Sequence, residues 1–159
     1  MTADDIRRYL ERAVALAREG MTASKGGPFG CVVVKDGQVL AEGYNRVTSD
    51  QDPTAHAEIV AIREACRRLG SFQLEGCTLF ASCEPCPMCL GAIYWARPAA
   101  VYYAGTRDDA ARAGFDDAFI YEEIDTTGAE RSIPFAHVPV PEATAVFNDW
   151  KRLSAKQSY

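Results

Sequence analysis

The sequence has no long hydrophobic run and no excess of positive charge. No stretch approaches the roughly 20 apolar residues that a membrane-spanning helix needs. Charged side chains recur through residues 4–12, so the N-terminus lacks the apolar core of a secretory signal peptide. We therefore expect a cytoplasmic protein that has no membrane partner.

Basic residues are both outnumbered and scattered. Seventeen Lys and Arg against 22 Asp and Glu give a net charge of -5. Nucleic-acid affinity comes mostly from phosphate contacts, which require a basic stripe on the protein surface. The largest local basic group is Arg63, Arg67 and Arg68, which lies beside Glu64 and is typical of a solvated helix face. The charge pattern therefore gives a nucleic-acid partner no support.

The chain also lacks internal repeats, low-complexity segments and recognisable linkers, which favours a single domain over residues 1–159. A domain of this length buries roughly 70% of the surface that its unfolded chain exposes. Cytosolic thiols stay reduced, so closely spaced members of the six cysteines favour metal or catalytic roles. Cys31, Cys66 and Cys77 stand apart and are interpreted as small buried hydrophobes.

Hydrophobic periodicity predicts helices and strands in alternation after an initial hairpin. Apolar residues at three- and four-residue steps predict an N-terminal helix that ends at Gly20. Asp36-Gly37 predicts a tight turn between antiparallel strands over 29–35 and 38–44. The other expected elements are helices over 55–69, 87–96 and 143–153, strands over 78–82, 99–104 and 133–140, and a short helix with a loop in 105–132. This order predicts an α/β fold, a three-layer α/β/α sandwich around a mixed sheet.

Three residues have the chemistry and spacing of a zinc site. His56 precedes a P-C-P-M-C segment at residues 85–89, which supplies Cys86 and Cys89. One imidazole and two thiolates are good zinc ligands, and a set of three leaves the fourth tetrahedral position for water, as in catalytic sites. Both cysteines begin a predicted helix, where the dipole and free N–H groups favour thiolates. We predict one catalytic Zn²⁺ bound by His56, Cys86 and Cys89.

Glu58 lies two residues after the histidine ligand. Zinc lowers the pKa of its water towards about 7 and so provides a nucleophile. Hydrolysis of an amidine-like C–NH2 group also needs a proton on the ring nitrogen and another on the leaving amine, which a neighbouring carboxylate can deliver. A histidine and glutamate in this spacing, followed by P-C-x-x-C, are the signature of zinc base deaminases. Glu58 is therefore the predicted catalytic proton shuttle.

Other interpretations of these residues are less specific. A single helical histidine or glutamate is usually packed or solvated, and two cysteines at this spacing also occur as redox pairs. Cys83 could add a third sulfur and close a structural zinc site that has no catalytic role. Against that, Cys83 ends a strand before the rigid Glu84-Pro85 step, and a closed site would leave Glu58 without a purpose.

Beyond these ligands, most of the chain resembles a known family. Residues 56–58 and 86–93 look like the cytidine deaminase superfamily, whose zinc motif they match. The similarity to its bacterial guanine deaminase branch extends nearly end to end, including the terminal Tyr159, and rests on residues 28–30, Asn45, residues 93–98 and residues 113–119.

This resemblance implies a five-stranded cytidine deaminase-like sheet, a homodimer with one zinc ion per subunit, and hydrolysis of guanine to xanthine and ammonia in purine metabolism. It also implies that the C-terminal segment can be exchanged between subunits, so that Tyr159 completes the neighbouring pocket. The implied substrate-binding residues are Asn45 and Asp117, which hydrogen-bond the purine, Phe29 and Trp95, which contact its ring faces, and Tyr159.

Each of these residues also has a structural interpretation. Asp117 could be an exposed loop carboxylate, Asn45 a turn former, Phe29 and Trp95 core residues, and Tyr159 a frayed end. Three functions compete with guanine deamination: deamination of tRNA adenosine, deamination of cytosine or another nucleobase, and a zinc-stabilised binding module without catalysis.

Overall fold

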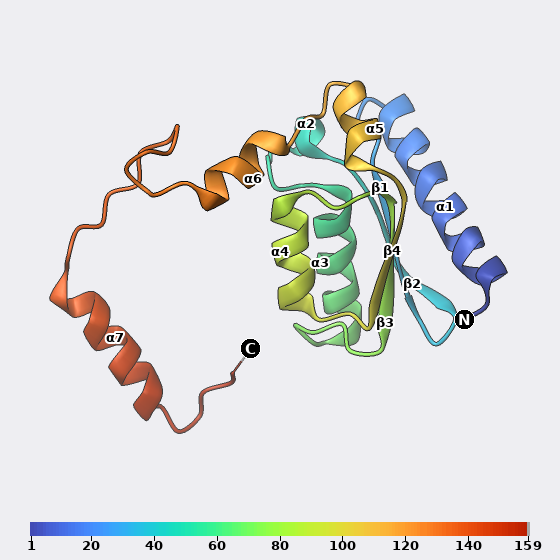
Figure 1. The fold of residues 1–159 in the computed structure, drawn as a ribbon. Coiled ribbons are helices and arrows are strands. Elements are labelled where there is room, and N and C mark those ends of the chain that lie inside the picture. Colours follow the sequence, from blue (N-terminus) through green and yellow to red (C-terminus); the bar gives the residue numbers. More distant parts are fainter. Residues whose placement is uncertain (159) are drawn as a thin grey trace. The chain divides into compact units, whose positions relative to one another are not determined.

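The computed structural model describes residues 1–158 and divides into two compact units, Met1–Asp117 and Ala118–Tyr159. The first unit contains every strand of the described chain (Figure 1). Its elements are α1 (Ala3–Thr22), β1 (Gly30–Lys35), β2 (Gln38–Tyr44), α2 (Val47–Asp50), α3 (Ala57–Leu69), β3 (Cys77–Cys83), α4 (Pro87–Ala96), β4 (Ala100–Gly105) and α5 (Arg107–Arg112). The second unit contains α6 (Ala118–Asp125) and α7 (Pro141–Arg152).

The sheet is mixed and has the strand order β2-β1-β3-β4. Strand β1 runs antiparallel to both β2 and β3, and β3 runs parallel to β4. The start of β1 therefore lies at the same edge of the sheet as the ends of the other three strands. Two pairs mark this edge, Gly30 opposite Tyr44 and Cys83 opposite Gly105. Open α/β sheets bind their ligands at the edge where parallel strands end.

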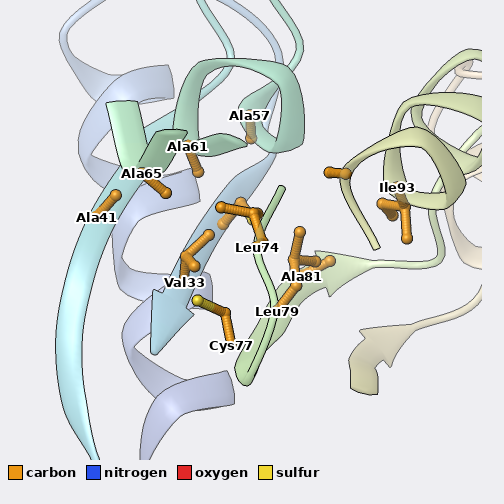
Figure 2. Packing of buried hydrophobic residues seen from close by; sticks show 12 residues of the cluster. Val33, Ala41, Ala57, Ala61, Ala65, Leu74, Cys77, Leu79, Ala81 and Ile93 are labelled. Carbon is orange, nitrogen blue, oxygen red and sulfur yellow. The ribbon is translucent and has the colours of Figure 1, made fainter. Parts of the chain in front are cut away.

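Alternate residues of the central strands face two helical layers. Val33, Leu79 and Ala81 pack with residues of α3 and α4 in one buried cluster (Figure 2). Val32 and Phe80 point to the opposite face and pack with Tyr9 and its neighbours on α1. Helices α3 and α4 thus cover one face and α1 the other, so the first unit is the three-layer α/β/α sandwich that was expected (Figure 1).

The N-terminal helix does not end at Gly20 as the sequence suggested. Helix α1 continues to Thr22, and Gly20 is buried within its last turn. A Cβ atom at this position would lie 2.7 Å from the ring of Tyr44. Close packing of α1 against the sheet, and not helix termination, therefore explains this glycine.

The predicted fifth strand is also absent from the described residues. The sheet has four strands, and residues 133–140 belong to the second unit, where they form no regular element. Pro134 and Pro139 remove two backbone donors from this segment, and a strand without its donors pairs poorly. The strand predicted over residues 133–140 is therefore wrong. Residues 105–132 contain two helices, α5 and α6, where one was expected.

The second unit presents many apolar side chains to solvent. Helix α7 closely matches the helix predicted over 143–153, and α6 precedes a long irregular segment. None of the residues described in α6 and α7 is buried. The large exposed apolar side chains of this unit include Phe119, Phe135, Val146, Phe147 and Trp150. Across residues 1–158, no helix has the length and apolar character needed to cross a membrane.

Candidate active site

Two of the predicted metal ligands occupy the same position in two different helices. His56 is the N-cap of α3 and Cys86 is the N-cap of α4. Their backbone angles are nearly equal, φ -66° and ψ 155° for His56 and φ -65° and ψ 168° for Cys86. Neither side chain caps its own helix. Both side chains are therefore available to meet each other between the two helix starts.

The distances fit a zinc ion. His56 Nδ1 lies 3.5 Å from Cys86 Sγ and 3.6 Å from Cys89 Sγ. Tetrahedral zinc, with Zn–S near 2.3 Å and Zn–N near 2.0–2.1 Å, separates its sulfur and nitrogen ligands by about 3.6 Å. All three ligand atoms lie within 4.8 Å of one another. The donor set, one imidazole and two sulfurs, is one that zinc prefers.

Cys83 does not join this cluster. Its thiol donates a hydrogen bond of 3.4 Å to the backbone oxygen of Thr106. Within residues 1–158, the groups able to hold a metal comprise His56, Cys86 and Cys89 only. A closed structural site with Cys83 as its third sulfur is therefore not formed, and a tetrahedral ion held by His56, Cys86 and Cys89 keeps one position for water.

The ligand thiols differ in their proton affinity. A hydrogen bond from Cys89, followed by one with His56, lowers the pKa of Cys86 to about 4. The same pairing with Cys86, followed by burial, raises the pKa of Cys89. The hydrogen bond with Cys86 also raises the pKa of His56. Cys86 is therefore a thiolate at neutral pH even without a metal, which prepares one anionic ligand.

Glu58 is a buried carboxyl group beside the ligands. It follows His56 into the first turn of α3 and is 7% exposed. The thiol of Cys89 donates to its Oε2 atom at 3.4 Å. Burial raises the pKa of Glu58, because a charged carboxylate is poorly solvated in this position. A carboxyl group with raised pKa next to a metal site can take up a proton and release it again.

Asn45 is held in one orientation at the same edge of the sheet. It directly follows β2 and is 5% exposed. Its Oδ1 atom accepts hydrogen bonds from the N–H groups of Gly27 (3.1 Å) and Val47 (3.2 Å). Backbone N–H groups only donate, so the oxygen and not the amide nitrogen must face them. The NH2 group of Asn45 is left to donate to a ligand that presents an acceptor.

Phe29, a predicted substrate-binding residue, forms an aromatic pair with Phe115, which was not among the predicted site residues. Their rings meet edge to face, with centroids 5.0 Å apart and an interplanar angle of 86°. Phe29 immediately precedes β1, at the edge of the sheet that carries Asn45. Phe115 is 44% exposed and follows α5. Phe115 lies in residues 113–119, a segment that resembles the bacterial guanine deaminase branch. This resemblance is the sequence signal that could have identified Phe115 as a site residue.

The remaining predicted residues lie at different distances from the metal ligands. Asp117 is half-buried, and burial, followed by the charge of Cys86, raises its pKa. Its contact with a base stays a prediction. Trp95 is 63% exposed on α4, about 9 Å along the helix from Cys89. Its contact with a substrate ring stays a prediction. Tyr159 lies outside the described residues.

The first unit combines a mixed sheet with a buried glutamate and, at two helix starts, a histidine and two cysteines. This combination is typical of zinc-dependent deaminases. The chain matches the model of the cytidine and deoxycytidylate deaminase zinc-binding region over residues 3–105. It belongs to this family. The predicted class of enzyme and the predicted cofactor, zinc, are thereby confirmed.

Individual relatives are similar over almost the whole chain. A guanine deaminase of Bacillus subtilis (strain 168) is 59% identical over 151 residues, which are 95% of this chain and 97% of the relative. The crystal structure of guanine deaminase from Bacillus subtilis superposes with a TM-score of 0.95 at 57% identity and covers 100% of this chain and 99% of that one. A tRNA-specific adenosine deaminase of Aquifex aeolicus (strain VF5) is 33% identical over 138 residues, 86% of this chain and 89% of the relative.

Proposed function

We propose that this protein hydrolyses guanine to xanthine and ammonia, with one zinc ion per subunit. The observation that carries the chemistry is the cluster of His56, Cys86 and Cys89 with the buried carboxyl of Glu58 beside it. The similarity to a guanine deaminase over 95% of the chain supports guanine as the base. The -5 net charge also favours a free base over a nucleic acid.

In this proposal each residue has a defined task. His56, Cys86 and Cys89 would hold a zinc ion, which would supply an activated water. Glu58 takes a proton from the water, delivers it to the ring nitrogen next to C2, and later moves a proton to the departing amine. The bond from C2 to the amino nitrogen breaks and a bond to the water oxygen forms. Guanine and water are thus converted to xanthine and ammonia.

The base is oriented by polar and aromatic groups. The NH2 group of Asn45 donates to an acceptor on the purine, because its oxygen is already bonded to Gly27 and Val47. Asp117 accepts from the N–H groups of guanine. Phe29 and Trp95 contact the ring faces. A base with the wrong pattern of donors leaves these groups unpaired, and such mismatches are strongly rejected.

A panel of substrates tests the proposal. Guanine, adenine, cytosine and a tRNA anticodon stem-loop are incubated with the zinc-loaded protein, and the products are identified by mass spectrometry. We expect xanthine from guanine and no turnover of the stem-loop. The similarity to a tRNA-specific adenosine deaminase makes that activity the second candidate. Turnover of the stem-loop without turnover of guanine would replace the proposed substrate and keep the zinc chemistry.

We further propose that the protein is a homodimer in which the C-terminal segments are exchanged and Tyr159 completes the partner's pocket. Helix α7 exposes apolar side chains such as Phe147 and Trp150. Exposed apolar side chains of this kind are typical of a surface that another subunit covers, which supports the proposed dimer. Complementation tests this arrangement. A Glu58→Ala variant is mixed with a variant lacking Tyr159 under conditions that exchange subunits. With exchanged segments, each mixed dimer regains one complete site.

The expected recovery is about a quarter of wild-type turnover, because half of the dimers are mixed and each of these has one working site of two. Without exchange, the intact tail stays with the inactive Glu58→Ala site and no activity is recovered.

We also propose a cytoplasmic location, which the six free cysteines support, since a reducing compartment keeps thiols available for the metal.

A further inference from the structure

The loop of residues 84–86, which carries the metal ligand Cys86 and is called the metal loop below, is hydrogen-bonded to the loop before α5. Strands β3 and β4 are parallel and end together, with Cys83 opposite Gly105. The N–H of Glu84 then donates to the oxygen of Gly105 at 2.9 Å. The Glu84 carboxylate accepts in return from the N–H of Arg107 at 3.1 Å. With the bond from Cys83 to Thr106, three hydrogen bonds join the two loops.

We propose that Glu84 is a positioning residue for the base pocket, an inference that rests on the proposed function. Its carboxylate holds α5, and through α5 the ring of Phe115, in place relative to the metal ligands. No role was expected for this glutamate beyond stiffening the chain before Pro85. It is half-buried and lies two residues before Cys86, so it belongs to the metal loop itself.

The helix itself does not need this bond. Thr106 and Asp109 form a complete capping box, in which the Thr106 hydroxyl accepts from the N–H of Asp109 at 3.2 Å. The N–H of Thr106 donates to the Asp109 carboxylate at 2.9 Å. The N–H of Arg107 is one of the donors that no intrahelical bond satisfies. Because the start of α5 is already capped, the bond to Glu84 fixes where the helix lies and adds little to its formation.

Helix α5 connects this bond to the aromatic pair. The helix is only six residues long, and the N–H of Phe115 donates to the oxygen of Ala110 at 3.0 Å just after it ends. Phe115 is thereby fixed to the helix. Its ring meets Phe29, which is anchored to the sheet edge by the neighbouring Gly30. A shift of α5 at Arg107 therefore moves the ring of Phe115, the wall that we assign to the base pocket, while the metal ligands stay in place.

Steady-state kinetics on guanine test the role. We expect Glu84→Ala to raise KM by about tenfold, the effect of losing one charged hydrogen bond, with kcat within about twofold and zinc content unchanged. Glu84→Gln keeps an acceptor oxygen and should restore most of the affinity. Asp108→Asn, which changes an exposed acid in the first turn of α5, is the matched control.

A double-mutant cycle separates positioning from a general structural role. If Glu84 acts through Phe115, the double variant Glu84→Ala/Phe115→Ala has the same KM as Phe115→Ala alone. Additive effects, or loss of zinc with a fall in kcat, overturn the proposal. Failure of the wild type to turn over guanine overturns the proposed function instead, and the cycle is then run on the base from the panel that is deaminated.

Hydrogen exchange gives a readout that does not depend on activity. In Glu84→Ala the amides of residues 107 and 115 should exchange faster, because α5 moves away from the metal loop more often. The amides of α3 and α4 should keep their protection. Unchanged exchange at both amides would show that the carboxylate does not hold α5, whatever the kinetics.

Discussion

The side-chain oxygen of Asn45 accepts a hydrogen bond from the backbone N–H of Gly27, eighteen residues earlier in the chain. The bond ties the loop before β1 to the end of β2. It also leaves the NH2 group of the Asn45 amide to meet a ligand, because the oxygen already accepts this hydrogen bond. The recognition properties of Asn45 therefore depend on the glycines of that loop.

The first prediction concerns Gly26. A Cβ atom at Gly26 would overlap the side-chain oxygen of Asn45 and would lie 2.5 Å from the backbone oxygen of Asn45. Gly26→Ala must therefore displace Asn45, and we expect KM for the base to rise on the order of tenfold, at a cost of about 1–3 kcal/mol in stability. Kinetics and thermal unfolding measure both effects. Lys25→Ala, an exposed position in the same loop, is the control, and an unchanged KM in Gly26→Ala would mean that Asn45 does not contact the base.

The second prediction concerns Glu58. Its carboxyl is buried beside the ligands but is not one of the three metal-binding groups. We expect Glu58→Ala to keep the fold and the zinc and to lose turnover by on the order of a hundredfold or more. Metal analysis and circular dichroism, run with the kinetics, separate a catalytic loss from a folding loss. Normal turnover in this variant would remove Glu58 from the mechanism.

The third prediction distinguishes Cys83 from the metal ligand Cys86 by the zinc content of their serine variants. Cys83→Ser should retain zinc, since its thiol is bonded to Thr106 and a hydroxyl can make the same bond. Cys86→Ser should lose most of its zinc, because it replaces a thiolate ligand. The zinc content of the purified variants is the measurement. Zinc loss in Cys83→Ser would indicate a closed site with four protein ligands.

The fourth prediction is a pH dependence of stability. Arg12 and Glu42 form a two-pronged pair, with both nitrogen–oxygen distances 2.7 Å, and the bond to Arg12 lowers the pKa of Glu42. Because the pKa of Glu42 is lower in the folded protein, its carboxylate stabilises the fold fully at pH values above its ordinary pKa of 4.5. This contribution is lost as the pH falls through the lower pKa of the folded state. The pair is partly exposed, so we expect Glu42→Gln to cost about 0.5–1 kcal/mol at neutral pH.

Urea unfolding across a pH series checks this sign. The difference between wild type and Glu42→Gln should be constant near pH 7 and vanish in acid. Glu75→Gln, at an exposed position, is the control. A gap between wild type and Glu42→Gln that widens in acid would contradict the assignment.

The sequence predicted most of the layer architecture and the metal ligands, because both follow from local spacing. Only local spacing along the chain is needed to predict the turn at Asp36, the helix over 87–96 and the grouping of His56 with the two cysteines. The sequence could not predict contacts that depend on tertiary placement. Glu84 meets Arg107 only because two parallel strands end in register, and no spacing rule connects them.

The two errors have different origins. Gly20 was interpreted as a helix stop because glycine usually ends helices, whereas its position is explained by the ring of Tyr44 across the layer. Residues 133–140 include β-branched and aromatic side chains that favour a strand, but Pro134 and Pro139 lack the backbone donors that strand pairing needs. A tertiary contact thus overrode the local preference at Gly20, whereas a local feature did so at the prolines.

The starts of α3 and α4 carry a further consequence. Each helix has at its N-cap a residue whose side chain meets the other metal-binding side chains rather than its own free N–H groups. A serine or aspartate in either position would strengthen the helix and abolish the ion site. Newly made chains that have not yet acquired zinc thus begin both helices without this reinforcement, and their lifetime against proteases depends on how soon the cell supplies the ion.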